Sequence, residues 1–248
     1  MKNFSSNKKI TAISIVTLLL LWEGASLIAS SPQLLPSPWA TAKAAVALLC
    51  TTDFLKIAGL TVLRSVTGFA IAAAAGVALG LAAGLNDRFN AFFRPWIVII
   101  RSIPVIAFAL LAIIWLNPGT VPILIGFLAM FPIIYLNTEE GIRSIDAKTV
   151  EMARFYSIRG LRLVKEVLLP AIRPFEISGI STAVGMGWRA CVVGEVLSQP
   201  QWGIGSVMHS AQTFLQVDTL LAWTIVTVVI GAAFEKIIRY GYRIGQCK

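Results

Sequence analysis

The apolar residues of this chain fall in long runs that are separated by short polar stretches. About six runs are long enough, at about 1.5 Å per helical residue, to cross a hydrocarbon layer of about 30 Å. They lie at Ile10–Ala29, Ile57–Leu85, Trp96–Leu116, Val121–Leu136, Ile177–Leu197 and Leu220–Ile238. The polar stretches at 30–56, 86–95 and 198–219 are expected to be loops. The pattern predicts an all-α, polytopic membrane protein with one transmembrane domain over residues 1–248.

Composition and charge support this interpretation and suggest an orientation. Hydrophobic residues make up 57% of the chain and charged residues 13%, which excludes an ordinary soluble domain. Sixteen of the 21 lysines and arginines lie in or beside the two tails, the 86–95 stretch and a polar segment at 137–176. Only Lys43 and Lys56 lie on the opposite side. The positive-inside rule therefore places both termini and the 137–176 segment in the cytoplasm, and the net charge of +9 needs no nucleic-acid partner.

The first apolar run has a second interpretation. Lys8-Lys9, the apolar run and then Ala29-Ser30-Ser31 are also the pattern of a cleavable signal peptide. The length of the run and its late Trp22-Glu23 favour a retained span instead. Cleavage would leave the orientation of the other five spans unchanged.

Small residues recur at every fourth position of the second run. The motif Gly76-x-x-x-Gly80-x-x-x-Gly84 follows Ala72 on one helical face, and such a stripe lets another helix approach closely. We expect Gly76, Gly80 and Gly84 to mediate helix packing, either within the chain or between subunits.

Two prolines fall inside predicted spans, Pro104 in the third and Pro132 in the fourth. A proline removes one backbone hydrogen bond of a helix and its ring clashes with the preceding turn. Each is therefore expected to kink its helix, because neighbouring helices can satisfy the freed carbonyl in a membrane bundle.

Four charged residues lie in or near apolar spans: Arg64, Arg101, Arg189 and Glu195. A charge inside the bilayer is unfavourable unless it is paired or faces water, so all four are candidates for a translocation path or for pairing. Arg64 and Arg101 lie near predicted span ends and could instead extend to the interface. Arg189 and Glu195 are six residues apart, which is too far for a contact along one helix.

The sequence has no signature of catalysis or of a bound cofactor. It lacks a phosphate-binding loop, an H-E-x-x-H zinc motif and a G-x-S-x-G nucleophile motif. The lone His209 has no cysteine or carboxylate at ligand spacing, and Cys50, Cys191 and Cys247 form no C-x-x-C pair. We expect neither an enzyme nor a metal site.

The 137–176 segment is expected to contain two short helices joined by a turn. Asp146 is a candidate N-cap, and Pro170 is expected to stop the second helix. The apolar faces are formed by Met152, Phe155 and Tyr156 in the first helix and by Leu161, Val164 and Leu168 in the second. A hairpin of this size fits either a docking element for another protein or a surface helix on the bilayer.

This hairpin resembles the loop motif of the inner-membrane permease subunits of ATP-binding cassette importers. That motif runs Glu-Ala-Ala, three residues, Gly, nine residues, Ile, one residue, Leu-Pro. Here it is Glu151-Met152-Ala153, Ser157, Val167 and Leu169-Pro170. Met152 replaces an alanine and Ser157 replaces the glycine, and Gly160 is a second candidate for the turn.

The resemblance extends over about residues 35–238 and is closest to the nitrate/sulfonate/taurine group. It is carried by Leu35-Pro36-Ser37-Pro38, Leu63–Phe69, Arg101-Ser102-Ile103-Pro104, Trp188 with Gly194–Leu197, and Trp202-Gly203-Ile204-Gly205. It implies a type I importer permease fold in a bacterial inner membrane. The coupling residues would be Glu151, Met152, Ala153, Ser157, Gly160, Leu169 and Pro170.

The same resemblance implies the partners. Two cytoplasmic ATPase subunits would bind ATP and Mg²⁺, an external binding protein would deliver the solute, and a second permease subunit, expected to be a copy of this chain, would complete the path. The expected solute is an aliphatic sulfonate or a taurine-like organic anion. A heterodimer, a gradient-driven carrier or channel without an ATPase, and a membrane scaffold are the alternatives.

Overall fold

The computed structural model describes residues 4–29, 31 and 34–244, and every regular element within them is helical. Ser30 and Cys247, which enter the sequence analysis, lie outside these ranges. The helices are α1 (Phe4–Ala29), α2 (Pro38–Leu49), α3 (Phe54–Leu85), α4 (Asp87–Ser102), α5 (Val105–Trp115), α6 (Val121–Arg143), α7 (Ala147–Phe155), α8 (Gly160–Leu163), the π-helical turn η1 (Val164–Leu168), α9 (Leu169–Ser198), α10 (Ile204–Thr213) and α11 (Val217–Ile244). The prediction of an all-α membrane protein is confirmed.

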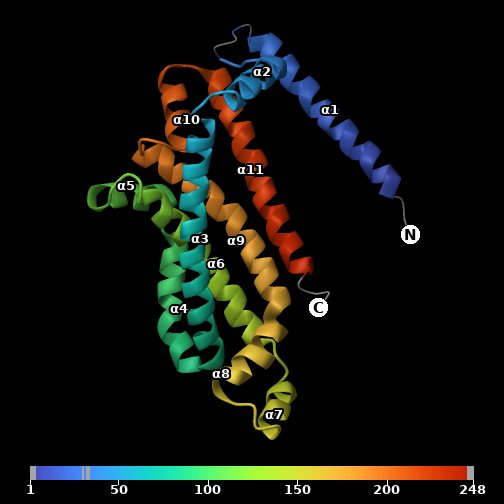
Figure 1. Cartoon of the computed structure of the whole chain (residues 1–248), viewed down its shortest axis with the longest axis vertical. Coiled ribbons are helices and arrows are strands. Elements are labelled where there is room, and N and C mark those ends of the chain that lie inside the picture. The colour runs from blue at the N-terminus through green and yellow to red at the C-terminus, as the bar shows by residue number, and fades with distance from the viewer. Residues whose placement is uncertain (1–3, 30, 32–33, 245–248) are drawn as a thin grey trace.

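The long helices form an upright bundle in which α3, α4, α6 and α9 lie close together (Figure 1). The short helices α7 and α8 lie below this bundle, while α2 and α10 lie at its upper end. The first helix, α1, extends away from the bundle and is joined to α2 at the top. The N-terminal end of α1 and the C-terminal end of α11 both point toward the α7–α8 side.

Five described helices are long and apolar enough to cross a membrane, and one bent pair passes the same test only when its two helices are taken together. This pair, α4 and α5, corrects the expected third span, Trp96–Leu116, because the chain bends by 95° between the two helices. Pro104 causes the break: it lacks an N–H group and forces the preceding Ile103 into extended backbone, at φ −70° and ψ 126°. Pro132, by contrast, lies inside the continuous helix α6.

The three expected loops are also corrected, since each contains helix. The 30–56 stretch holds α2, in which the Ser37 hydroxyl accepts a hydrogen bond from Ala40 N at 3.2 Å beside Pro38 at the first position. The 86–95 stretch is the first half of α4, capped by the Asn86 side chain. The 198–219 stretch contains α10.

Pro170 does not stop a helix, so this expectation was wrong. It lies in the first turn of α9, directly after the π-helical turn η1, and the helical path continues through it. The chain from Gly160 to Ser198 passes through α8, η1 and α9 without a gap. One π-helical turn, closed by Leu169 N donating to Val164 O, adds the extra residue that accommodates the junction.

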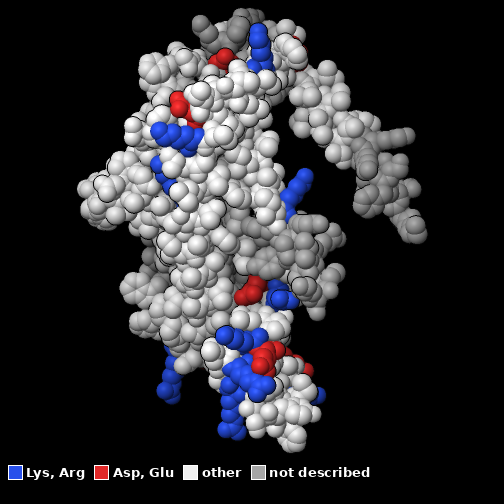
Figure 2. Space-filling model, in the orientation of Figure 1, with Lys and Arg blue, Asp and Glu red and all other residues white. Residues whose placement is uncertain are grey.

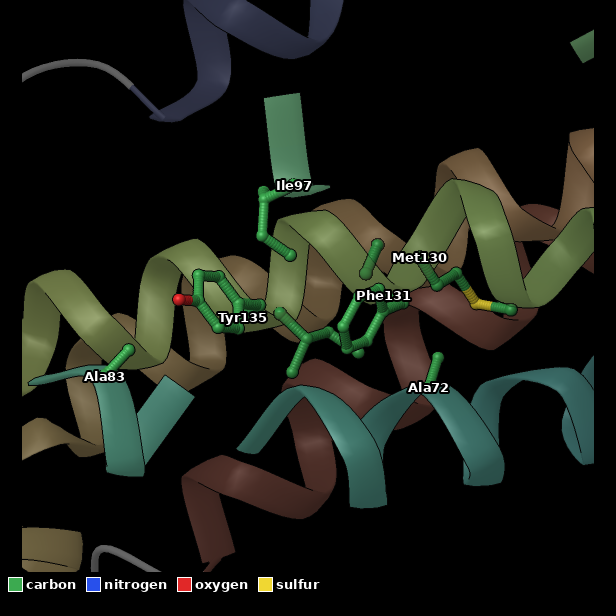
Figure 3. Packing of buried hydrophobic residues seen from close by; sticks show 8 residues of the cluster. Ala72, Ala83, Ile97, Met130, Phe131 and Tyr135 are labelled. Carbon is green, nitrogen blue, oxygen red and sulfur yellow. The ribbon is translucent and has the colours of Figure 1, made fainter. Parts of the chain in front are cut away.

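The core of the bundle lies between α3 and α6 (Figure 3). Ala72 and Ala83 on α3 face Met130, Phe131 and Tyr135 on α6. The glycine stripe of α3 lies on the same contact. A Cβ atom at Gly76 would lie 2.9 Å from Ile134 Cβ, one at Gly80 would lie 2.7 Å from Tyr135 O, and one at Gly84 would lie 2.6 Å from Ile142 Cβ.

Charge is distributed as a membrane protein requires. On the face shown in Figure 2, most lysines, arginines, aspartates and glutamates gather around α7 and α8 or near the upper end, and a broad band between them is largely uncharged. Large apolar side chains are exposed along α1, α4 and α5. They suit a bilayer or a neighbouring subunit rather than water.

Candidate functional site

The α7–α8 hairpin presents one side of its motif to solvent and buries the other. The Asp146 carboxylate accepts a hydrogen bond from Lys148 N at 3.0 Å, so Asp146 caps α7 as expected. Glu151 and Met152 are exposed, whereas Ala153 retains only 3% exposure. A small side chain is therefore needed at position 153, while positions 151 and 152 can contact another molecule.

Ser157 occupies a left-handed position at the end of α7. Its φ is +59°, and the next residue, Ile158, donates its N–H to Ala153 O at 2.9 Å. This bond closes a Schellman motif, in which glycine is the usual residue at the left-handed position. Gly160 also has a positive φ, +56°. Both residues therefore form the turn, and the motif glycine has a physical role that Ser157 fills at a conformational cost.

We expect Ser157→Gly to stabilise the hairpin by up to about 1 kcal/mol, because the left-handed penalty of about 1–2 kcal/mol exceeds the extra entropy that glycine loses on folding. Gly160→Ala should have the opposite effect, although a Cβ at Gly160 meets nothing within 4 Å. Hydrogen exchange at the Ile158 amide of the two variants measures the difference. Equal protection in both would contradict the left-handed assignment.

The hairpin is held to the bundle by a small apolar cluster. Leu168 and Ile172 are 1% and 0% exposed and pack with Ile142 at the end of α6. Leu169 packs against the same cluster, and Pro170 next to it is exposed. The second half of the motif thus joins the hairpin to the membrane helices α6 and α9.

The tip of the hairpin exposes apolar side chains that no described residue covers. Phe155 is 86% exposed, Tyr156 71%, Leu161 70% and Met152 59%. We call these four residues the apolar tip. The rings of Phe155 and Tyr156 touch each other edge to face, with centroids 5.8 Å apart. Such a cluster is typical of a contact surface for a membrane or another protein.

At the opposite end of the bundle, Arg64 and Glu195 form a buried ion pair between α3 and α9. Glu195 is fully buried, and the Arg64 side chain is 12% exposed. Thr61 Oγ1 and Gly205 N donate to Glu195 Oε2 at 2.9 and 3.0 Å, and Arg64 Nη1 also donates to Trp202 O at 2.7 Å. We call Thr61, Arg64 and Glu195 the upper polar cluster.

The Trp202–Gly205 segment wraps closely around this cluster. Ile204 N donates to Thr61 Oγ1 at 2.9 Å. A Cβ atom at Gly203 would lie 2.7 Å from the Glu195 carboxylate, and one at Gly205 would lie 2.5 Å from Val192 O. The two glycines are thus needed because the backbone passes where a side chain would collide.

The other two intramembrane arginines lie apart from this cluster. Arg189 is exposed on α9, and its Nε donates to Gly185 O on the same helix at 3.0 Å. Arg101 is exposed at the end of α4, beside the bend.

His209 Nε2 lies 3.2 Å from Gln199 Nε2, and the described residues contain no group of three or more His, Cys, Asp or Glu that could hold a metal.

Sequence reasoning did not pair Arg64 with Glu195, and it missed Thr61 altogether. The available signal was topological: Arg64 lies near the start of the second span and Glu195 near the end of the fifth, so both lie at the same end of the bundle. Two opposite charges in apolar helices at the same depth are expected to pair.

Comparison with known proteins supports a transport role. Residues 76–241 match the family described as "Binding-protein-dependent transport system inner membrane component". The chain is 32% identical to the putative aliphatic sulfonates transport permease protein SsuC of Escherichia coli, over 87% of this chain and 82% of that protein. It is 29% identical to the SsuC protein of Bacillus subtilis (84% and 76% covered) and 27% identical to the taurine transport system permease protein TauC of Escherichia coli (90% and 84% covered).

Proposed function

This chain belongs to the family of binding-protein-dependent transport system inner membrane components, and we propose that it forms the path for an aliphatic sulfonate or a taurine-like anion in an ATP-driven importer. Membership makes it a permease subunit of an ATP-binding cassette importer for a small solute and not itself an enzyme. Hydrolysis of ATP with Mg²⁺ would take place in two copies of a separate cytoplasmic subunit.

The observation that carries this proposal is the exposed hairpin below the bundle. Helices α7 and α8 lie below the bundle (Figure 1) and expose Glu151 and the apolar tip, while Leu168 and Ile172 anchor the same segment in the core. A closure of two ATPase subunits around this hairpin would be transmitted to α6 and α9 as a rigid-body movement. The orientation that this requires, with both termini and the hairpin in the cytoplasm, is the one favoured by the positive charges.

The solute class is supported by the relatives that are named for sulfonates and taurine. A relative named for bicarbonate transport, CmpB of Synechococcus elongatus, is 28% identical over 74% of the chain and 66% of that protein, so small oxyanions recur among these names. An external binding protein would deliver the anion to the upper end of the bundle.

A second permease subunit would complete the path, and a copy of this chain is the proposed partner. Helix α5 projects sideways from the bundle and leaves Ile106, Leu110, Ile114 and Trp115 exposed. An apolar helix of 11 residues that lies at 95° to α4 is too short to cross a bilayer alone. Packing against a second subunit would cover it.

We expect Glu151→Arg to weaken ATPase binding at least about tenfold, or about 1.4 kcal/mol, because it reverses a charge in the proposed docking surface. The membrane helices should be unaffected, since Glu151 is exposed. Asp53→Arg is the matched control: it reverses an exposed aspartate at the opposite end, whose side chain makes no capping bond. If the Glu151→Arg variant fails to insert into the membrane, Glu151 is required for folding rather than for ATPase binding.

Purification from the native membrane in mild detergent, with mass spectrometry of the bound proteins, tests the proposal. An ATPase subunit at near-equal stoichiometry is the expected result. A protein that is reproducibly alone, and that takes up solute in protein-only vesicles driven by an ion gradient without ATP, would overturn the proposal in favour of a gradient-driven carrier.

A further inference from the structure

A polar cleft opens between α4 and α6, on the half of the bundle nearer α7 and α8. Its volume is about 300 Å³. It is lined by Asn90, Arg94, Ile97, Val98, Arg101, Tyr135, Leu136, Glu139 and Arg143. The cleft is separate from the hairpin and from the upper polar cluster. Of its lining residues, the sequence analysis singled out only Arg101.

The acidic side of the cleft already has its partners. Glu139 Oε1 accepts hydrogen bonds from Asn90 Nδ2 at 2.7 Å and from Arg143 Nε at 2.8 Å. Arg143 Nη2 also donates to Asp87 at 2.7 Å. The charge of Arg143 is therefore balanced by two carboxylates, and this network fixes the lower wall of the cleft between the two helices.

The remaining polar groups of the cleft are donors without acceptors. Within the described part of the chain, the side chains of Arg94 and Arg101 form no ion pair or hydrogen bond, and both are exposed. The Tyr135 hydroxyl is buried and has no hydrogen-bond partner, although the residue is only 1% exposed. A buried hydroxyl without a partner is unfavourable unless something else fills its place.

The spacing of the donors suits one small anion. Arg94 and Arg101 are seven residues apart on α4, so they lie on the same helical face, about 10 Å apart along the axis, and two long side chains can converge on a group between them. Arg101 lies fourteen residues after the start of α4, about 21 Å along the axis, where the surrounding sequence is apolar. An unpaired cation in an apolar span is unfavourable unless it faces water or a bound anion.

We infer that the α4–α6 cleft binds the oxyanion group of a small soluble solute, with Arg94 and Arg101 as charged donors and the Tyr135 hydroxyl as a neutral donor. This inference rests on the proposed function, since the cleft would be a station for the transported anion between the upper end and the cytoplasm. The guanidinium groups would pair with a sulfonate or a similar oxyanion through charge-assisted hydrogen bonds, which are about twice as strong as neutral ones.

The test uses the complete transporter in liposomes, with ATP-dependent uptake of labelled ethanesulfonate as the readout. In the Arg94→Gln and Arg101→Gln variants, uptake should fall at least about tenfold, because each loses a charged hydrogen-bond donor to the anion. In Tyr135→Phe, uptake should fall severalfold. Arg88→Gln is the matched control, because Arg88 is also exposed on α4 but lies outside the cleft. Yield of the complex should be the same in all four variants.

A binding measurement separates this inference from the proposed function. Ethanesulfonate, but not chloride, should raise the melting temperature of the purified complex, and Arg101→Gln should abolish the shift. Uptake equal to wild type in all three cleft variants, or a melting temperature that ethanesulfonate does not change, overturns the inference while the importer proposal stands. Absence of ATP-driven uptake with an intact melting shift overturns the importer proposal alone.

A second arm identifies the source of the oxyanion. The same melting experiment is run in phosphatidylcholine bilayers with and without phosphatidylglycerol. A soluble solute site predicts an ethanesulfonate shift in both membranes. A shift that requires phosphatidylglycerol and is lost in Arg101→Gln would mean that a lipid phosphate occupies the cleft, which also overturns the inference.

Discussion

Glu195→Ala is expected to destabilise the protein by about 3–5 kcal/mol, because it leaves one half of a buried ion pair without its partner. The Arg64 guanidinium would retain only the Trp202 carbonyl, the Gly205 amide would lose its acceptor, and the Thr61 hydroxyl would retain as a donor only its longer bond to Ile57 O at 3.2 Å. These groups lie where water is scarce, so no solvent molecule would fully replace the carboxylate. The loss should loosen the Trp202–Gly205 segment and separate α10 from α3.

The measurement is the temperature at which half of the detergent-purified protein is lost from the monodisperse fraction. Arg189→Met is the control, because Arg189 is also an arginine within an apolar span but is exposed and bonded only to its own helix. It should lower stability little. The double variant Arg64→Met with Glu195→Leu should recover part of the loss, since removing both charges is less harmful than removing one.

Two outcomes would contradict this account of the upper polar cluster. If Glu195→Ala is no less stable than Arg189→Met, the pair does not hold α3 and α9 together. If the double variant loses as much stability as the Arg64→Met and Glu195→Leu single variants lose in sum, the two charges do not interact in the folded protein.

The membrane character of the fold could be predicted from the sequence because a span requires a long apolar run and short-range composition reveals it. Five of the six predicted spans correspond to single long helices. The third does not, because its apolar run continues across Pro104 while the chain turns by 95°. Hydrophobicity indicates the surroundings of a segment but not the direction of its helix axis. Pro104 therefore indicated that the helix would be interrupted, but not the angle between its two parts.

The turn of the hairpin and the partners of the intramembrane charges were harder to predict. Ser157 has a left-handed backbone conformation that serine disfavours, and for this reason the sequence indicated Gly160 as the turn residue in its place. In the structure both residues have a positive φ and both form the turn. The pairing of Arg64 with Glu195 joins positions 131 residues apart and depends on how α3 and α9 face each other. The cleft with Tyr135 depends on a side-chain hydroxyl that no sequence spacing marks.

Gly80→Leu is expected to destabilise the protein by about 3 kcal/mol or more, because it overpacks the contact between α3 and α6. The first added atom would already lie 2.7 Å from the Tyr135 carbonyl oxygen and 2.8 Å from Thr138 Cβ. The oxygen belongs to the backbone of α6, so no rotamer change can relieve the collision. The two helices would have to separate along the stripe that Gly76 and Gly84 share.

A glycine-to-leucine substitution elsewhere on α3 is the control, because it makes the same chemical change without the close contact to α6. Gly59 is also in α3, is exposed, and has nothing within 4 Å of a Cβ atom, so Gly59→Leu should be neutral or slightly stabilising through helix propensity. Melting of both variants in the same detergent isolates the packing term. If Gly80→Leu and Gly59→Leu have the same melting temperature, the glycine stripe faces lipid or another subunit. Phe131 and Tyr135 would then hold α3 and α6 together without the two helix backbones approaching closely.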